Sequence, residues 1–146
     1  LISSPDKEDS SVTNGSSIAM LVKYRNKKIL LLGDSYPSVI CESLTELGYS
    51  DNNKLTVDLV KTSHHGSRYN SSHALWKMIH SPKFIISTNG TKHQLPHKQA
   101  LAKIIASQSN AELLFNYPIY QKIFSEEDHQ KYNFSASLIE QGGITL

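Results

Sequence analysis

Val-Asp-Leu-Val-Lys-Thr-Ser-His-His-Gly-Ser, the stretch from Val57 to Ser67, joins a short apolar run to two adjacent histidines, a glycine and a serine. The β-branched and apolar residues at its start predict a strand, and the glycine predicts a sharp turn directly after the histidines. A strand that ends in this way holds imidazole rings at its tip, and imidazole is a common metal ligand. The stretch therefore predicts part of a metal site at one edge of a sheet.

A second stretch upstream supplies the complementary ligand type. Lys28 to Leu32 is another apolar run, and it ends in Gly33 and Asp34. Two buried strands side by side, one followed by a carboxylate and the other by imidazoles, would bring oxygen and nitrogen ligands together at one sheet edge. Taken alone, Asp34 could instead cap the helix that follows it.

The composition indicates one globular domain. The chain has 146 residues, of which 38% are hydrophobic and 19% charged. A formal charge of +2 gives no argument for nucleic acid as a partner. The single cysteine, Cys41, excludes an internal disulfide and fits a reducing compartment. Because no run approaches the ~18 apolar residues of a membrane helix, we expect a soluble, cytoplasmic protein.

Strand-like and helix-like runs alternate along the chain. We expect residues 1–15 to be a loop or linker and residues 16–146 to form the domain. Strands are predicted at 18–24, 27–32, 57–61, 84–87 and 113–115, a last hairpin at 135–139 and 144–146, and helices at 37–47, 71–80 and 98–107. This alternation predicts a layered α/β domain whose site lies beyond the strand ends.

The order of four motifs resembles a known family. Asn-Gly-Ser-Ser from Asn14, Leu-Leu-Gly-Asp ending at Asp34, the Val57 to Ser67 stretch and Ile-Ile-Ser-Thr-Asn-Gly ending at Gly90 resemble the C-terminal half of metallo-β-lactamase-fold hydrolases. The branch most similar to this pattern contains the hydrolase domain of the competence protein ComEC. The resemblance implies a four-layer αββα sandwich with two divalent metal ions, zinc or manganese, that activate a water to attack a phosphodiester or acyl bond.

The resemblance also implies roles for individual residues. Asp34 resembles the aspartate that bridges the two metals, and His65 looks like the terminal metal ligand, with His64 as its competitor or as a group that supports it. A bridging carboxylate suits that position because two neighbouring cations repel each other unless an anion lies between them. Asp58 is a candidate partner for the second nitrogen of a metal-bound imidazole.

Several expected ligands are not in this sequence. The His-x-His-x-Asp-His string of the family's N-terminal half is missing, and its later His-Pro step is replaced by Leu95-Pro96, with His93 and His97 on either side. The remaining half could belong to the same polypeptide, which a loop-like start without methionine favours, or to a partner subunit. A degenerate relative without catalysis is the third explanation. A half-sandwich alone would expose a flat apolar sheet face.

These observations together predict a metal-dependent hydrolase, in particular a phosphodiesterase or nuclease. Arg68 and Lys92, with His93 and His97 in the same loops, are predicted to contact the substrate. The alternative is a catalytically inactive binding or regulatory module. Scattered histidines such as His73 and His129 are expected to be surface or packing residues.

Overall fold

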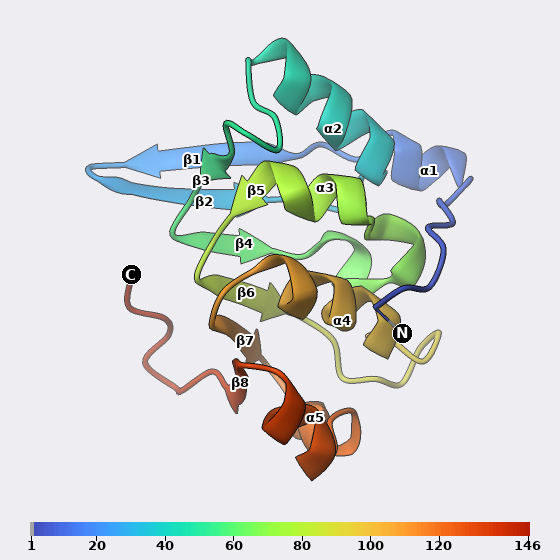
Figure 1. Ribbon diagram of the computed structural model, residues 1–146, viewed down its shortest axis with the longest axis vertical. Helices are drawn as coiled ribbons and strands as arrows, with labels where there is room; N and C mark the ends of the chain where they lie inside the picture. Colours follow the sequence, from blue (N-terminus) through green and yellow to red (C-terminus); the bar gives the residue numbers. More distant parts are fainter. Residues whose placement is uncertain (1) are drawn as a thin grey trace.

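The computed structural model describes residues 2–146 and centres on a six-stranded mixed sheet (Figure 1). The strand order is β1-β2-β4-β6-β7-β8, with β1 antiparallel to β2 and every later pairing parallel. The bounds are β1 Met20–Tyr24, β2 Lys27–Leu31, β4 Leu59–Lys61, β6 Lys83–Ile86, β7 Ala111–Phe115 and β8 Phe134–Leu138. Parallel strands joined through helices confirm the α/β class.

Helices follow most of the parallel strands. They are α2 (Pro37–Glu46), α3 (His73–Met78), α4 (Lys98–Ser107) and α5 (Glu126–Lys131), with the four-residue α1 (Val12–Gly15) before β1 and 3₁₀ turns η1 (Ser63–Gly66), η2 (Arg68–Asn70) and η3 (Pro118–Lys122). The predicted 98–107 helix is confirmed as α4. The helix predicted over 71–80 is shorter, because β5 (Ile79–His80) pairs with β3 (Leu55–Thr56) in a small second sheet.

The hydrophobic core lies between the large sheet and the helices. Alternate strand positions such as Leu30, Val60 and Phe84 pack with residues of α2, α3 and α4, including Ile40, Trp76 and Leu101. A strand order that advances in one direction, with right-handed crossovers, places successive helices on the same side of a sheet. Figure 1 shows α2, α3 and α4 together on the side of the sheet that faces the reader.

The other side of the sheet carries a second set of apolar side chains. Strand register places Met20, Val22 and Tyr24 of β1 beside Leu31, Ile29 and Lys27 of β2 on this side. Met20 is 53% exposed, Val22 41% and Tyr24 68%. The C-terminal segment reaches this side where Lys83 Nζ donates to the carbonyl of Thr145 at 2.9 Å. Leu59 and Leu114, which share this side by register, are buried. We call this side of the sheet its second face.

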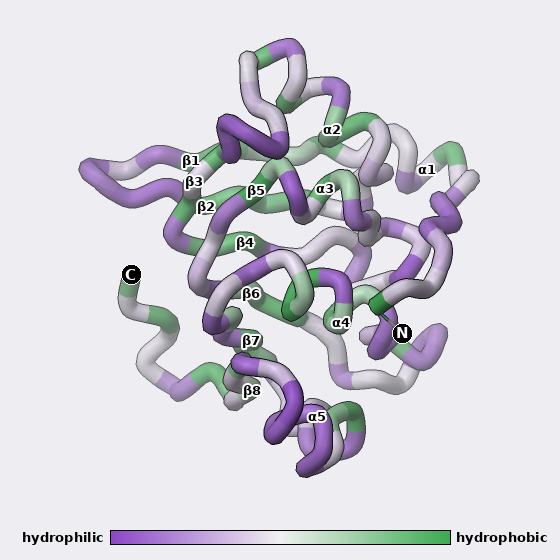
Figure 2. The backbone as a smooth tube through the Cα atoms, in the orientation of Figure 1, coloured by the Kyte–Doolittle hydropathy of each residue, from purple (hydrophilic) through white to green (hydrophobic). Residues whose placement is uncertain are grey.

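The end of the chain differs from the predicted hairpin. Residues 134–138 form β8, which pairs in parallel with β7, and residues 144–146 form no strand. The prediction of a 135–139/144–146 hairpin is therefore wrong. α5, whose sequence is polar throughout, follows β7 in the chain and lies on the crossover to β8. In Figure 2 its backbone has the colour of hydrophilic residues.

Residues 2–15, expected to be a loop or linker, are irregular apart from α1. They are nevertheless anchored to the domain, since Asp6 pairs with Lys103 Nζ at 2.6 Å and Glu8 accepts from the Ser38 amide at 2.8 Å. Within the described part of the chain, no helix combines the length and the apolar character that a bilayer crossing requires.

Candidate functional site

Three loops meet where β2, β4 and β6 end, and we call this place the carboxyl edge of the sheet. Asp34 follows β2, His64 and His65 follow β4, and the segment from Ser87 to His97 follows β6. The His64 amide donates to the Gly33 carbonyl at 2.9 Å, and the Ser63 hydroxyl donates to the Ser35 carbonyl at 2.8 Å. The backbone thus places the Gly-Asp and His-His motifs side by side, as the sequence predicted.

Both glycines of these motifs are required by the backbone. Gly33 has φ +56°, and a Cβ there would lie 2.5 Å from Ser17 Oγ. That hydroxyl accepts the Asp34 amide hydrogen at 2.8 Å, so the close approach of Ser17 helps to fix Asp34. Gly66 has φ +84°, and a Cβ there would lie 2.7 Å from the Cβ of Pro96. Only glycine combines this conformation with so little space.

The two histidines occupy a strained turn. His64 and His65 both have positive φ, 42° and 56°, which non-glycine residues seldom adopt. Such strain persists only where the surroundings hold it in place, and it concentrates at functional sites. Their rings lie edge to face with centroids 6.1 Å apart.

His65 is exposed and has one ring nitrogen engaged. Its Nδ1 lies 2.5 Å from the carbonyl oxygen of Ser87, which can only accept a hydrogen bond. The hydrogen is therefore on Nδ1, and Nε2 of the neutral ring carries a lone pair. A carbonyl partner of this kind is typical of histidines that bind metals.

His64 is half-buried, and its Nδ1 lies 3.1 Å from the side-chain oxygen of Asn70. Asn14 Nδ2 lies 3.3 Å from the same nitrogen, and Asp9 Oδ2 lies 3.6 Å from it. These partners are not the ones predicted. Asp58 accepts from the Lys28 amide at 2.8 Å and pairs with Lys27, at the start of β4, so its proposed contact with a site histidine is wrong.

Asp34 is half-buried beside these histidines. It does not cap the following helix, because the N-cap residue of α2 is Tyr36 and the Ser38 amide in the first turn donates to Glu8. Its charge acts on Lys61: burial lowers the pKa of the Lys61 ammonium, and the Asp34 carboxylate partly opposes that change. The Asp34 carboxylate therefore has no capping role in α2.

The predicted substrate residues line two adjoining cavities. Arg68 and His97 line one of about 420 Å³, Lys92 lines another of about 360 Å³, and both cavities are lined by His64 and His93. The Arg68 amide donates to His97 Nδ1 at 3.2 Å, so Nδ1 of this imidazole accepts and carries no hydrogen. Burial, with the nearby Arg68 guanidinium and His64 imidazole, lowers the pKa of His97.

The donor types at the carboxyl edge suit a divalent transition metal, but their number does not. Asp34, His64 and His65 offer a carboxylate and two imidazoles. Within residues 2–146, however, no group of three or more His, Cys, Asp or Glu side chains is arranged to hold a metal ion. These residues would therefore need ligands from outside this part of the chain.

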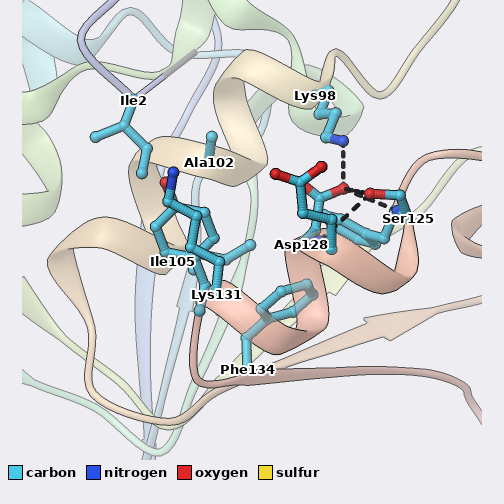
Figure 3. Close-up of a pocket in the computed structure, with 11 residues that line it drawn as sticks. Ile2, Lys98, Ala102, Ile105, Ser125, Asp128, Lys131 and Phe134 are labelled. Carbon is cyan, nitrogen blue, oxygen red and sulfur yellow. Dashed lines mark hydrogen bonds and ion pairs between the residues drawn. The ribbon is translucent and has the colours of Figure 1, made fainter.

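Other polar groups lie away from this edge. A cavity of about 290 Å³ between α4 and α5 is lined by Lys98 and Asp128, which form an ion pair in Figure 3, and by Phe134. His73 pairs with Asp6 at 3.1 Å, and His129 stacks on Phe134 with centroids 4.6 Å apart. Both contacts agree with the expected surface and packing roles.

Comparison of the chain with protein-family models, with curated proteins and with solved structures gave no match.

Proposed function

We propose that this chain forms half of a metal-dependent hydrolase that cleaves phosphodiesters, as a phosphodiesterase or nuclease. The observation that carries the proposal is the meeting of Asp34 with His64 and His65 at the carboxyl edge. The hydrogen bond of 2.9 Å from the His64 amide to the Gly33 carbonyl joins the two motifs directly. In open α/β sheets, ligands bind at this edge.

Within the proposal, Asp34, His65 through Nε2, and His64 would hold two divalent ions, zinc or manganese, with Asp34 as the shared carboxylate. When bound, such ions supply Lewis acidity to a phosphoryl oxygen and to water. Arg68, Lys92, His93 and His97 line the adjoining cavities, where their donors would orient an anionic ester.

The missing ligands would come from a second half, either in the same polypeptide or in a partner subunit. Support comes from the second face of the sheet, where Met20 and Tyr24 are 53% and 68% exposed. A second sheet packed there at about 10 Å would bury these side chains and give the four-layer αββα sandwich of the metallo-β-lactamase fold.

Replacing the bridging carboxylate tests the proposal. Asp34→Ala in the complete assembly should lower metal-dependent cleavage of a simple aryl phosphodiester to the level of metal-free protein. Elemental analysis should find about two metals per copy in the unaltered assembly and fewer in the variant. The matched control is Asp51→Ala, which removes an exposed loop carboxylate that pairs only weakly with Lys54 at 3.9 Å. Unchanged cleavage in Asp34→Ala would refute the assignment.

The second candidate function is a catalytically inactive binding or regulatory module. It is favoured by the incomplete ligand set within residues 2–146. If the assembly binds neither zinc nor manganese when supplied with both, this second function replaces the first.

A further inference from the structure

The starting observation is the buried amide of Asn70, which is 1% exposed. Its Nδ2 faces three oxygen atoms, the carbonyls of Asp34 at 3.0 Å and Ser35 at 3.5 Å and the Asp9 carboxylate at 3.4 Å. Only the nitrogen end of an amide can donate, so the end that faces these acceptors is Nδ2. The orientation of the Asn70 side chain is therefore fixed by its surroundings.

This orientation decides where His64 carries its hydrogen. With Nδ2 turned to the oxygens, Asn70 Oδ1 faces His64 Nδ1 at 3.1 Å. An amide oxygen accepts and cannot donate, so the hydrogen of that contact is on Nδ1. Asn14 Nδ2 lies farther from Nδ1, at 3.3 Å, and donates to Asp9 Oδ2 at 2.6 Å. A neutral imidazole has one N–H, and Nε2 is then left with its lone pair. Within residues 2–146, Nε2 of His64 has no hydrogen-bond partner.

Asp9 reinforces the same arrangement. Its Oδ2 lies 3.6 Å from His64 Nδ1 and accepts from Asn14 Nδ2 at 2.6 Å, while Oδ1 accepts from the Ser11 amide at 2.9 Å. Burial opposes ionisation of Asp9, but the hydrogen bonds from Asn14, Ser11 and Asn70 outweigh it and lower the pKa. A negative charge beside Nδ1 favours the hydrogen on that nitrogen.

We propose that Asn70 and Asp9 are positioning residues that hold the His64 ring with its hydrogen on Nδ1 and its Nε2 lone pair open to the cavities. Asn70 also binds the backbone of Asp34, so one buried side chain sets the relative position of the two motifs. That His64 Nε2 binds a metal ion rests on the proposed function. The position of the ring hydrogen on Nδ1 does not depend on it.

The state of the ring can be measured without metal or substrate. In protein labelled with ¹⁵N at histidine and held at about pH 8, where imidazole is neutral, the two ring nitrogens have distinct NMR shifts. The His64 signals are identified by their loss in His64→Gln. We expect the hydrogen on Nδ1, whereas free histidine in water favours it on Nε2. A His64 ring with its hydrogen on Nε2 overturns the proposal.

Two variants test the positioning role. Asp9→Asn keeps the size of the side chain, and Asn70→Ala removes the amide; both should shift His64 toward the Nε2–H form and weaken zinc binding by the assembly about 10- to 100-fold. The matched control is Glu8→Gln, which removes the neighbouring carboxylate of the same segment. Glu8 contacts Ser38 and not His64, so this variant should leave the ring unchanged.

The outcomes separate this inference from the proposed function. If Asn70→Ala does not fold, the His64 tautomer measured in Asp9→Asn alone decides whether the positioning role holds. If the hydrogen of His64 stays on Nδ1 in a folded Asp9→Asn variant, the role of Asp9 is overturned. If it stays on Nδ1 in a folded Asn70→Ala variant, the role of Asn70 is overturned. If the ring behaves as expected and the assembly never cleaves a phosphodiester, the proposed function fails and the positioning role stands.

Discussion

At the scale of single residues, Gly66 shows how the carboxyl edge depends on close backbone contacts. Gly66 follows the two histidines and has a positive φ of +84°. Pro96, from the loop after β6, lies directly against it. The His97 amide donates to the Gly66 carbonyl at 3.0 Å. One residue thus joins the β4 and β6 loops that carry the predicted site.

Gly66→Ala should destabilise the protein more than Gly48→Ala. Both glycines have φ +84°, but a Cβ at Gly48 meets nothing within 4 Å. Gly48→Ala should cost about 1–2 kcal/mol for the left-handed backbone alone. Gly66→Ala should cost about 1–3 kcal/mol more because of the clash with Pro96. Urea unfolding of the two variants measures the difference, and equal losses would contradict the contact.

The sequence predicted that Asp34 and the two histidines lie at this edge but not the residues that contact them. Asp34 and the two histidines were found because each motif ends an apolar strand run. Asn70 and Asp9 carry no such signal, since Asn70 stands six residues after His64 and its contact with Asp9 spans 61. Contacts between distant residues cannot be read from periodicity, which reports only local geometry.

At the scale of elements, local pattern located most strands and helices. The strands of the β1–β2 hairpin were predicted because two apolar runs flank a two-residue turn, and α4 because its apolar spacing is regular. The C-terminal prediction was wrong because Gly142 and Gly143 suggested a local hairpin, whereas residues 134–138 pair with β7, which is distant in sequence. Residues 118–132 gave only a weak pattern, since α5 buries no residue.

The contact between α4 and α5 should give the protein a distinctive acid sensitivity. The hydrogen bond from Lys98, with those from Ser125, lowers the pKa of Asp128 from 3.8 to about 2 (Figure 3). Because the folded pKa is below the unfolded value, the carboxylate stabilises the fold fully above about pH 4, and this contribution is lost as the pH falls through about 2.

Unfolding in urea at a series of pH values measures this contribution. Asp128→Asn should be less stable than the unaltered protein at pH 5, and the difference should shrink toward pH 2. Glu126→Gln, in the same first turn of α5, is the control and should show no such convergence. A difference that stays constant across this range would assign the effect to packing instead of charge.

At the scale of the whole molecule, one face of the sheet is covered by helices, and the other exposes apolar side chains along β1. The covered face contains the core with Leu30, Val60 and Phe84. The second face carries partly exposed apolar side chains on β1 and β2, next to the hydrophilic tip of the hairpin in Figure 2. Open apolar sheet faces of this kind favour association.

The chain on its own should therefore associate as its concentration rises. Val22→Glu places a charge on the second face beside Ile29 and should shift the distribution in sedimentation velocity toward monomer. Lys23→Glu changes the adjacent residue, whose side chain points to the opposite side of the strand, and should have little effect. A chain that stays monomeric at every concentration would argue against a docking role for this face.

The anchoring of the N-terminal segment has a consequence for protein synthesis. Lys103, which is 1% exposed, pairs with Asp6, 97 residues earlier in the chain. The N-terminus leaves the ribosome first, so Asp6 cannot form this ion pair until α4 has emerged. Asp9 likewise cannot accept from the Asn70 amide until the chain as far as Asn70 has left the ribosome.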